Sequence, residues 1–367
     1  MKVGKRSRAG DSDLQADDPL GMRSIGRREL VADAGALFLC GLAGKQILLD
    51  QPADVEALAK DVEVPPKVEA ARAGGAPEAR TVLAAAGGTR EYWIRAEKVR
   101  WNVVPTGRDQ MMRHKVKGRT TFTAYAYRQY TEDFGEPLGK AKIPGPLIEA
   151  DIGDVVIVHF ENRLPVPVTI HPHGIQYSAD MDGSYKGPFT DPGGFVQRGD
   201  RVDYMWEAIP GSEGAWFYHD HGPVTPIPLY KGLFGPIIVR DPAKPRPDRE
   251  FFVGFHAFPP AATGIKGQMF SCVNGRAFTG NTPNFQARVG EDVAWHVYVL
   301  DNYFHTFHLH GHRWRDPSDS RNIDNFTVGP GDVESARFIE DNPGRWFYHC
   351  HVFSHLEHGM IGWYRVE

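Results

Sequence analysis

The stretch Asp154-Val-Val-Ile-Val-His-Phe160 is a short, almost continuous apolar run rich in β-branched residues, which is typical of a buried β-strand. Similar runs occur at Thr121-Phe-Thr-Ala-Tyr-Ala-Tyr127 and Gly235-Pro-Ile-Ile-Val-Arg240. Turn signals such as Asp191-Pro-Gly-Gly194 separate the runs, in the manner of an antiparallel sandwich. The pattern between residues 91 and 240 therefore predicts a β-sandwich domain.

A second set of apolar runs follows a proline-rich, charged linker, Asp241-Pro-Ala-Lys-Pro-Arg-Pro-Asp248, and begins at Phe251-Phe-Val-Gly-Phe255. The two halves also resemble each other. Leu147-Ile-Glu-Ala-Asp-Ile-Gly-Asp154 is similar to Phe285-Gln-Ala-Arg-Val-Gly-Glu-Asp292, and each stretch precedes a strand and then a histidine cluster. We therefore predict an all-β protein that contains two copies of one β-sandwich, at residues 91–240 and 249–367.

The composition is that of a globular protein with many turns. The chain has 367 residues, enough for about two domains, and its 40 glycines and 28 prolines favour short strands over long helices. Lysine and arginine (42) nearly balance aspartate and glutamate (46), so the chain lacks the overall basic charge that is typical of a nucleic-acid binder. Three scattered cysteines are too few for a disulfide framework.

The N-terminal segment, residues 1–90, is of low complexity and differs from the rest. It is charged at first and later rich in Ala, Gly and Pro, a composition that predicts no buried core. Within it, Arg27-Arg28 precedes eleven uncharged residues at 34–44, too few for the roughly 20 that span a bilayer. This arrangement resembles a twin-arginine export signal. We expect an exported protein, periplasmic, cell-surface or extracellular, without an integral membrane span.

Most of the sixteen histidines fall into four clusters. The clusters are His171-Pro-His173, His219-Asp-His221, His305-Thr-Phe-His308-Leu-His310 and His349-Cys-His351. A single His-x-His pair is more often chance or a packed pair than a binding site, but four clusters in one chain are hard to explain by packing. Clustered imidazoles are a usual way to bind transition metals, so the clusters predict metal sites.

Strand parity sorts these residues, because successive side chains of a strand point to opposite faces. By this rule, Cys350 faces away from the histidines on either side of it. In the same way, His305 faces away from His308 and His310, from which it is separated by odd numbers of residues. Parity therefore groups Cys350 with His305.

Two further residues complete this group. Adding His355 and Met360 gives two imidazoles, one thiolate and a weak thioether, the ligand set of a blue, electron-transferring copper. The eight remaining imidazoles, four from each domain, can meet across a domain interface and be shared as two, three and three among three copper ions. Since Cys350 is bonded to a histidine on each side, a short covalent route joins the two sites.

These motifs resemble those of the multicopper oxidases. His305-x2-His308-x-His310-Gly and His349-Cys-His351-x3-His355-x4-Met360 match the signature of that family. The resemblance covers about residues 91–367, and the two domains are more similar to the two-domain bacterial small laccases than to the three-domain laccases of fungi. It implies cupredoxin-like Greek-key sandwiches and four copper ions per chain: one type 1 ion, one type 2 ion and a type 3 pair.

The resemblance also implies a role for each ligand. The type 1 ligands would be His305, Cys350, His355 and Met360. The type 2 ligands would be His171 and His308. One type 3 ion would be bound by His173, His219 and His351, and the other by His221, His310 and His349.

Three further residues resemble functional residues of the small laccases. Asp182 and Asp324 are candidate proton donors for oxygen reduction beside the trinuclear site, although an aspartate before a glycine, or a solvated aspartate, is ordinarily a turn or surface residue. Tyr177 is similar to a tyrosine that can be oxidised near that site, and a packed tyrosine with a bonded hydroxyl is the alternative.

The sequence therefore predicts a laccase-like oxidase that takes single electrons from a small phenolic or aromatic-amine donor and reduces O2, its co-substrate, to water. The family resemblance implies a homotrimer with trinuclear centres between subunits, and an intrachain interface stays open as an alternative. A ferrous or cuprous ion oxidase is the runner-up. Nitrite reduction is weakened because Asp220 replaces a thiolate in the first domain, and the eight extra imidazoles argue against a simple electron carrier.

Overall fold

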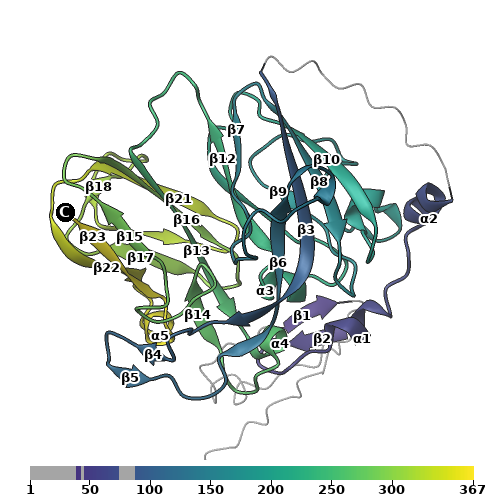
Figure 1. Ribbon diagram of the computed structural model, residues 1–367, viewed down its shortest axis with the longest axis horizontal. Helices are drawn as coiled ribbons and strands as arrows, with labels where there is room; N and C mark the ends of the chain where they lie inside the picture. Colours follow the sequence, from purple (N-terminus) through teal and green to yellow (C-terminus); the bar gives the residue numbers. More distant parts are fainter. Residues whose placement is uncertain (1–38, 43–44, 74–86) are drawn as a thin grey trace, which may run out of the picture. The chain divides into compact units, whose positions relative to one another are not determined.

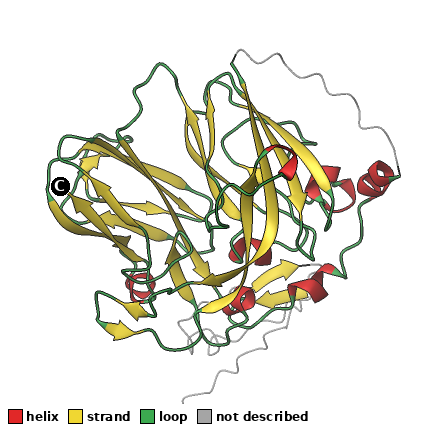
Figure 2. Cartoon of the chain, viewed as in Figure 1, coloured by secondary structure: helices red, strands yellow, loops and turns green. Residues whose placement is uncertain are grey.

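The computed structural model describes residues 39–42, 45–73 and 87–367. Strands dominate these residues and the helices are short (Figure 2). Within the described ranges, we find no helix with the length and apolar composition needed to span a bilayer. Arg27-Arg28, which the export prediction uses, lies outside them.

Two four-stranded sheets make up the first sandwich, and all of their strands lie between Thr89 and Arg240 (Figure 1). The order in one sheet is β10 (Arg201–Glu207), β8 (Val155–Asn162), β3 (Thr89–Asn102) and β6 (Thr121–Tyr130). The order in the other is β7 (Ile148–Asp151), β12 (Phe234–Arg240), β11 (Gly214–His219) and β9 (His171–Pro172).

The second sandwich lies between Arg249 and Val366. The order in one sheet is β14 (Phe270–Val273), β13 (Arg249–Phe258), β16 (Asp292–Val299) and β21 (Val333–Ile339). The order in the other is β15 (Asn284–Ala287), β23 (Ile361–Val366), β22 (Gly344–Cys350), β17 (His305–Leu309) and β20 (Asn325–Val328).

The two sandwiches repeat one topology, which confirms the predicted duplicated all-β fold. Each has a parallel pair in its first sheet, β3 with β8 and β13 with β16. Each has another in its second sheet, β7 with β12 and β15 with β23. The expectation of antiparallel sandwiches is therefore wrong at these pairs. Turn signals report only strands that are neighbours in sequence, whereas these partners are joined by connections through other strands.

The remaining described elements are small. Three two-stranded ribbons pair β1 (Leu39–Leu42) with β2 (Lys45–Leu48), β4 (Arg108–Asp109) with β5 (His114–Lys115), and β18 (Trp314–Arg315) with β19 (Asn322–Ile323). The helices are α1 (Val55–Ala59), α2 (Pro66–Arg72), α3 (Ile227–Tyr230), α4 (Pro260–Thr263) and α5 (Phe353–Glu357). Short 3-10 turns are η1 (Glu132–Phe134), η2 (Gly187–Phe189) and η3 (Pro192–Gly194).

An apolar cluster joins the two sandwiches, which belong to one compact unit, residues 38–367. Phe217 of the first sandwich stacks on Tyr298 of the second at 6.1 Å between ring centres. The Trp101 indole donates a hydrogen bond of 2.6 Å to the Gly275 carbonyl. Both aromatic rings of the stacked pair are fully buried, so the junction is packed like a domain core.

Part of the N-terminal segment contributes to the first core, and the expectation that it buries none is wrong for residues 47–55. Ile47, Leu49 and Val55 are between 5% and 7% exposed and belong to the same cluster as the interior of the first sandwich. The Leu49 carbonyl also accepts a hydrogen bond of 3.1 Å from the Ala261 amide. Composition averaged over ninety residues hides this short apolar stretch within a low-complexity segment.

We expect the substitution Val55→Ala to lower the free energy of unfolding by about 2 kcal/mol, because it removes two buried methyl groups and leaves a cavity. Denaturant unfolding of the metal-free protein measures this effect. The matched control is Lys60→Ala, at an exposed position just after α1. An unchanged midpoint for Val55→Ala would show that the segment is not part of the core.

Candidate metal centre

Three groups of side chains in the described residues have ligand atoms within 4.8 Å of one another. One group lies in the first sandwich and two lie in the second. They are His171, His173 and His219; His305, Cys350 and His355; and His308, His310 and His349. The structure therefore brings together nine of the twelve residues that the sequence predicts as ligands.

The fully buried group, which we call the thiolate group, consists of His305, Cys350 and His355. Strand β17 alternates between buried and half-buried residues, so His305 points into the core while His308 points to the opposite face. The Nδ1 atoms of His305 and His355 are 3.1 Å apart, and Cys350 Sγ is 3.6 Å from His355 Nδ1. Two imidazole nitrogens and one sulfur thus converge on a single point, as a copper ion requires.

Met360 is buried beside this group. Its carbonyl accepts a hydrogen bond of 3.1 Å from the Cys350 amide, and its own amide donates one of 3.0 Å to the His355 carbonyl. The backbone therefore holds Met360 against two members of the thiolate group.

The environment favours a charged thiolate and an imidazolium in the metal-free protein. Burial raises the pKa of Cys350, but hydrogen bonds from His305 and His355 outweigh burial and lower the pKa to about 6. Burial lowers the pKa of His305, but its hydrogen bonds to Asp301 and Cys350 raise it to about 9. Since the thiolate is the form of cysteine that binds metals, Cys350 is prepared for metal binding.

Asp301 positions His305 and was missed by the sequence analysis. Its Oδ1 atom lies 3.0 Å from His305 Nε2 and also accepts a hydrogen bond of 3.0 Å from the Tyr303 amide. A carboxylate on the outer nitrogen of a ligand imidazole fixes the ring and leaves Nδ1 facing the metal. The spacing of four residues before His305 is the only sequence signal, and it is weak on its own.

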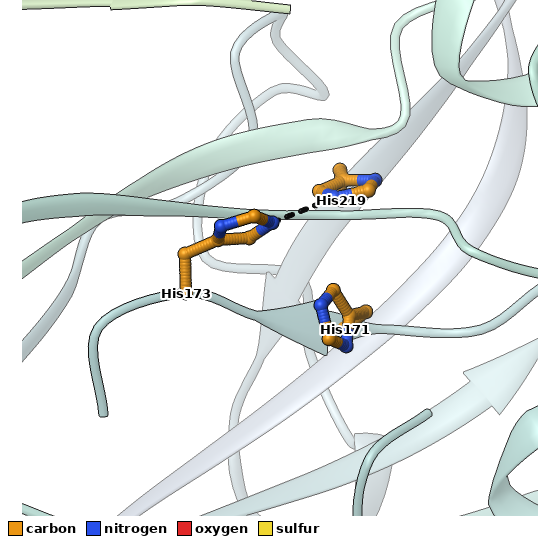
Figure 3. A group of neighbouring side chains, drawn as sticks. All are labelled: His171, His173 and His219. Atoms are coloured by element: carbon orange, nitrogen blue, oxygen red, sulfur yellow. Dashed lines mark hydrogen bonds between the residues drawn. The ribbon is translucent and has the colours of Figure 1, made fainter. Parts of the chain in front are cut away.

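The first half-site consists of His171, His173, His219 and His221. His173 Nε2 lies 3.1 Å from His219 Nε2, and His171 lies beside this pair (Figure 3). The Nδ1 atoms of His171 and His219 donate to the carbonyls of Asp182 and Asp220, at 2.7 and 2.8 Å. These bonds leave Nε2 of both rings free to bind a metal.

The second half-site, which consists of His308, His310, His349 and His351, repeats this geometry. His310 Nε2 and His349 Nε2 are 3.0 Å apart. The Nδ1 atoms of His308 and His349 donate to the carbonyls of Asp324 and Cys350, at 2.8 and 2.9 Å. Each half-site thus presents one close pair of Nε2 atoms and, outside that pair, one ring held by an aspartate carbonyl, His171 or His308.

Several of the half-site imidazoles have lowered pKa values, which prepares them to bind metal as neutral ligands. Burial lowers the pKa values of His173 and His349 to about 4, and it lowers those of His171 and His219 as well. Their lone pairs are therefore available at neutral pH.

The fourth ring of each half-site lies next to the others but outside the groups whose ligand atoms are within 4.8 Å of one another. His221 lies 5.2 Å from His171, and His351 lies 5.5 Å from His308, between ring centres. In the part of the chain that the structure describes, no metal-sized group combines histidines of both half-sites. The trinuclear set that the sequence predicts is therefore divided between two places in the single chain.

The structure places the three other predicted site residues as follows. Asp182 Oδ1 is 3.0 Å from His171 Nδ1, and Tyr177 packs edge-on against the same ring at 5.8 Å. Burial raises the pKa of Asp182, but the hydrogen bond from Lys186, the charges of His171 and Lys186 and the hydrogen bond from Ser184 together lower it. Asp324 Oδ2 is 4.0 Å from His308 Nδ1 and its side chain is 55% exposed, so its contact with the half-site is mainly through its carbonyl.

In the first sandwich, a buried aspartate and a half-buried threonine occupy the place of the thiolate group. Asp220 stands between His219 and His221 as Cys350 stands between its histidines. The Thr225 hydroxyl donates to the Asp220 carboxylate, whereas five residues after Cys350 it is His355 that contacts the thiolate. Between residues 87 and 240, all of which the structure describes, there is therefore no blue-copper ligand set.

Comparisons with known proteins agree on one family. A family model described as multicopper oxidase matches residues 139–244, and a second model with the same description matches residues 255–367. Together the two matched regions cover more than half of the chain.

Curated relatives carry several activities in their names. A probable nitrite reductase-hydroxylamine oxidoreductase fusion protein of Kuenenia stuttgartiensis is 34% identical over 250 residues, 61% of this chain and 28% of that protein. Mouse (Mus musculus) hephaestin is 26% identical over 350 residues, and human (Homo sapiens) ceruloplasmin 28% over 342 residues; these regions are 77% and 76% of this chain. The chain spans only 30% and 31% of these two proteins.

Solved structures share the fold. A crystal structure of a multicopper oxidase superposes with a TM-score of 0.61 at 22% identity, covering 88% of this chain and 100% of that chain. The multicopper oxidase mgLAC superposes with a TM-score of 0.60 at 24% identity, covering 76% of this chain and 86% of that chain. At these identities the likeness shows a common cupredoxin-like architecture.

Proposed function

Because the chain belongs to the multicopper oxidase family, we propose that it is a laccase-like enzyme that couples four one-electron oxidations of a phenolic or aromatic-amine donor to the reduction of O2 to two waters. The family makes the chain a copper-binding oxidoreductase. The observation that carries the finer proposal is the pair of complementary half-sites, since reducing O2 fully needs a site for several ions and not the thiolate group alone.

The residues fit copper in chemistry and in arrangement. We assign the type 1 site to the thiolate group with Met360, a set of soft and imidazole ligands that suits copper. The two close Nε2 pairs would each supply two ligands of one type 3 ion, and the fourth ring of the opposite half-site would supply the third. This sharing yields the sets His173, His219 and His351, and His310, His349 and His221. His171 and His308 remain for the type 2 ion. When bound there, copper supplies one-electron transfer between the donor and O2.

The chain itself connects the two kinds of site. Cys350 is joined by peptide bonds to His349 and His351, and the His349 ring donates to the Cys350 carbonyl at 2.9 Å. The thiolate group and the second half-site are therefore adjacent through covalent and hydrogen bonds, without intervening solvent.

Asp182 and Asp324 are proposed to deliver protons near the half-sites. Asp182 is the better placed of the two, because its carboxylate contacts the His171 ring and is 17% exposed. Asp324 reaches solvent, as a residue that exchanges protons with water must. Tyr177 packs edge-on against His171 at 5.8 Å between ring centres, and we propose it as an oxidisable ring near the first half-site.

Assembly of the trinuclear site requires two half-sites to meet. We propose a head-to-tail homotrimer, in which the first half-site of each subunit faces the second half-site of its neighbour. Phe353, whose ring is 5.7 Å from His351 of the second half-site, is 70% exposed, and Phe189, in the loop that follows Asp182, is 74% exposed. Exposed aromatic side chains of this kind are typical anchors of a protein interface.

The relatives support one other donor class. Human and mouse relatives are named ferroxidase, and a ferrous or cuprous ion oxidase is therefore the second candidate. Oxygen uptake by the copper-loaded protein distinguishes the two. We expect steady uptake with a methoxyphenol and with an aromatic diamine, with one O2 consumed for four electrons. Uptake with ferrous ion but with neither organic donor would overturn the laccase-like proposal in favour of the second candidate.

We propose export by the twin-arginine route on the basis of Arg27-Arg28 and the apolar run after it. Expression with Arg27 and Arg28 both replaced by lysine is expected to retain the protein inside the cell, and fractionation measures this. Unchanged export of the variant would contradict the route.

Asp301 is expected to strengthen type 1 copper binding. Removing a carboxylate that orients a ligand imidazole typically weakens metal binding about 10- to 100-fold, and we expect this loss for Asp301→Ala. Copper titration of the metal-free protein, followed by the blue absorption, measures the affinity. Asp341→Ala, at a residue whose side chain is 61% exposed, is the control. Equal affinity of Asp301→Ala and the parent protein would rule out the positioning role.

A further inference from the structure

Helix α2 lies against the loop that carries Asp182, although it belongs to the N-terminal segment and lies outside both family models. It contacts η2 and η3, the two turns of the loop formed by residues 182–194. Val68 of α2 is 3% exposed, so the helix is packed and not merely adjacent. Arg72 at its end pairs with Asp200, beyond the loop.

A continuous series of ion pairs runs from α2 to the first half-site. Lys67 Nζ lies 2.8 Å from Asp191 Oδ1, and Asp191 Oδ2 lies 3.9 Å from Lys186 Nζ. Lys186 Nζ then lies 2.8 Å from Asp182 Oδ2, whose other oxygen is 3.0 Å from His171 Nδ1. Positive and negative charges alternate along this series, so each contact supports the next.

Backbone contacts tie the same loop to the half-site. The Tyr185 amide donates a hydrogen bond of 3.0 Å to the His221 carbonyl. The backbone of Lys186 is held in place as well. Its amide donates a hydrogen bond of 2.7 Å to the hydroxyl of Thr190, a fully buried residue. A shift of the loop would therefore move both the Asp182 carboxylate and the backbone of a half-site histidine.

We propose that α2 is a positioning segment for the first half-site: through Lys67 and Asp191 it holds the 182–194 loop, and with it the Asp182 carboxylate, against His171. The consequence for metal binding rests on the proposed function, whereas the coupling between α2 and the loop does not. In this proposal, the N-terminal segment helps to position residues of the first half-site.

Hydrogen exchange of the metal-free, full-length protein tests the coupling. Lys67→Glu places like charges together, and because exposed ion pairs contribute at most about 1 kcal/mol, we expect exchange in the 182–194 loop to rise about two- to fivefold. Val68→Asp should release α2 and raise loop exchange at least about tenfold. Lys60→Glu, an exposed charge reversal on the same segment, should leave the loop unchanged, and residues 308–325 serve as the internal reference.

A double-mutant cycle separates the ion pair from a general loss of structure. In an Asp191→Asn background, Lys67→Glu should have no further effect on the loop, because its partner charge is already gone. If α2 itself exchanges faster in Lys67→Glu and Val68→Asp while the loop does not, the proposal is overturned. Equal effects of Lys67→Glu with and without Asp191 would also overturn it.

Copper binding is measured separately, by titration and paramagnetic resonance of the parent protein and Lys67→Glu. We expect a weakened or altered type 2 signal in the variant and an unchanged type 1 signal. A type 2 signal identical to that of the parent, despite faster loop exchange, would overturn the role of α2 in the site. A parent protein without any type 2 signal would instead contradict the proposed function, and the exchange result would stand.

Discussion

Replacing Cys350 by serine is expected to abolish the blue absorption, remove one copper ion per chain and reduce oxygen uptake more than about 100-fold. The reduction follows because even residues that only orient a ligand typically contribute about 10- to 100-fold, and Cys350 is the sole sulfur anion of the thiolate group. It is also the residue that joins this group to the second half-site through the backbone. Absorption spectra, copper analysis and steady-state oxygen uptake measure the three effects.

Cys272→Ser is the matched control for this substitution. Cys272 is the other described free cysteine whose side chain is buried, and burial raises its pKa well above the usual value, so it remains a neutral thiol. We expect the control to keep the blue absorption and the oxidase rate. A Cys350→Ser protein that remains blue and active would refute the assignment of the type 1 site.

The second large effect is complementation between two inactive variants. His173→Ala with His219→Ala disables the first half-site, and His310→Ala with His349→Ala disables the second. Each variant alone should be inactive. If the two are mixed by dissociation and reassembly, three quarters of random trimers contain both kinds of subunit, and each of these has one intact interface of three. We therefore expect about a quarter of the parent activity to return.

The intrachain alternative predicts a different result. A trinuclear site formed within one chain would remain incomplete in every subunit of the mixture, so no activity would return. Copper analysis of the mixed sample gives a second readout, because restored interfaces also restore bound ions. Mixing two batches of the same variant is the control for damage or recovery during reassembly.

Strand parity predicted the grouping of His305 with Cys350 that the structure shows among the candidate ligands of the second sandwich. His305 and Cys350 are buried in the second sandwich, and His308 lies on the opposite face of β17, in which buried and half-buried residues alternate. The duplication was also visible in the sequence, since each copy places similar residues before the same strand. A period of two residues and a repeated motif depend only on residues that are near one another in the sequence, so they can be read without the folded structure.

Other features needed the folded chain. The role of Asp301 depends on a loop that returns its carboxylate to His305, and a single aspartate carries no periodic signal. The packing of α2 joins Lys67 to Asp191, 124 residues away. The low-complexity composition of the N-terminal segment predicted instead that this segment has no buried core. Parallel strand pairs likewise arise from long connections, which turn signals do not report.

The copper content of the reconstituted protein tests the central claim most directly. Paramagnetic resonance on the same sample counts how many of the ions are magnetically visible. The proposed function predicts about four copper ions per chain, of which about two are silent because they form a coupled pair. About two ions per chain, both visible, would contradict oxygen reduction at a trinuclear site and would leave electron transfer or nitrite reduction as the function.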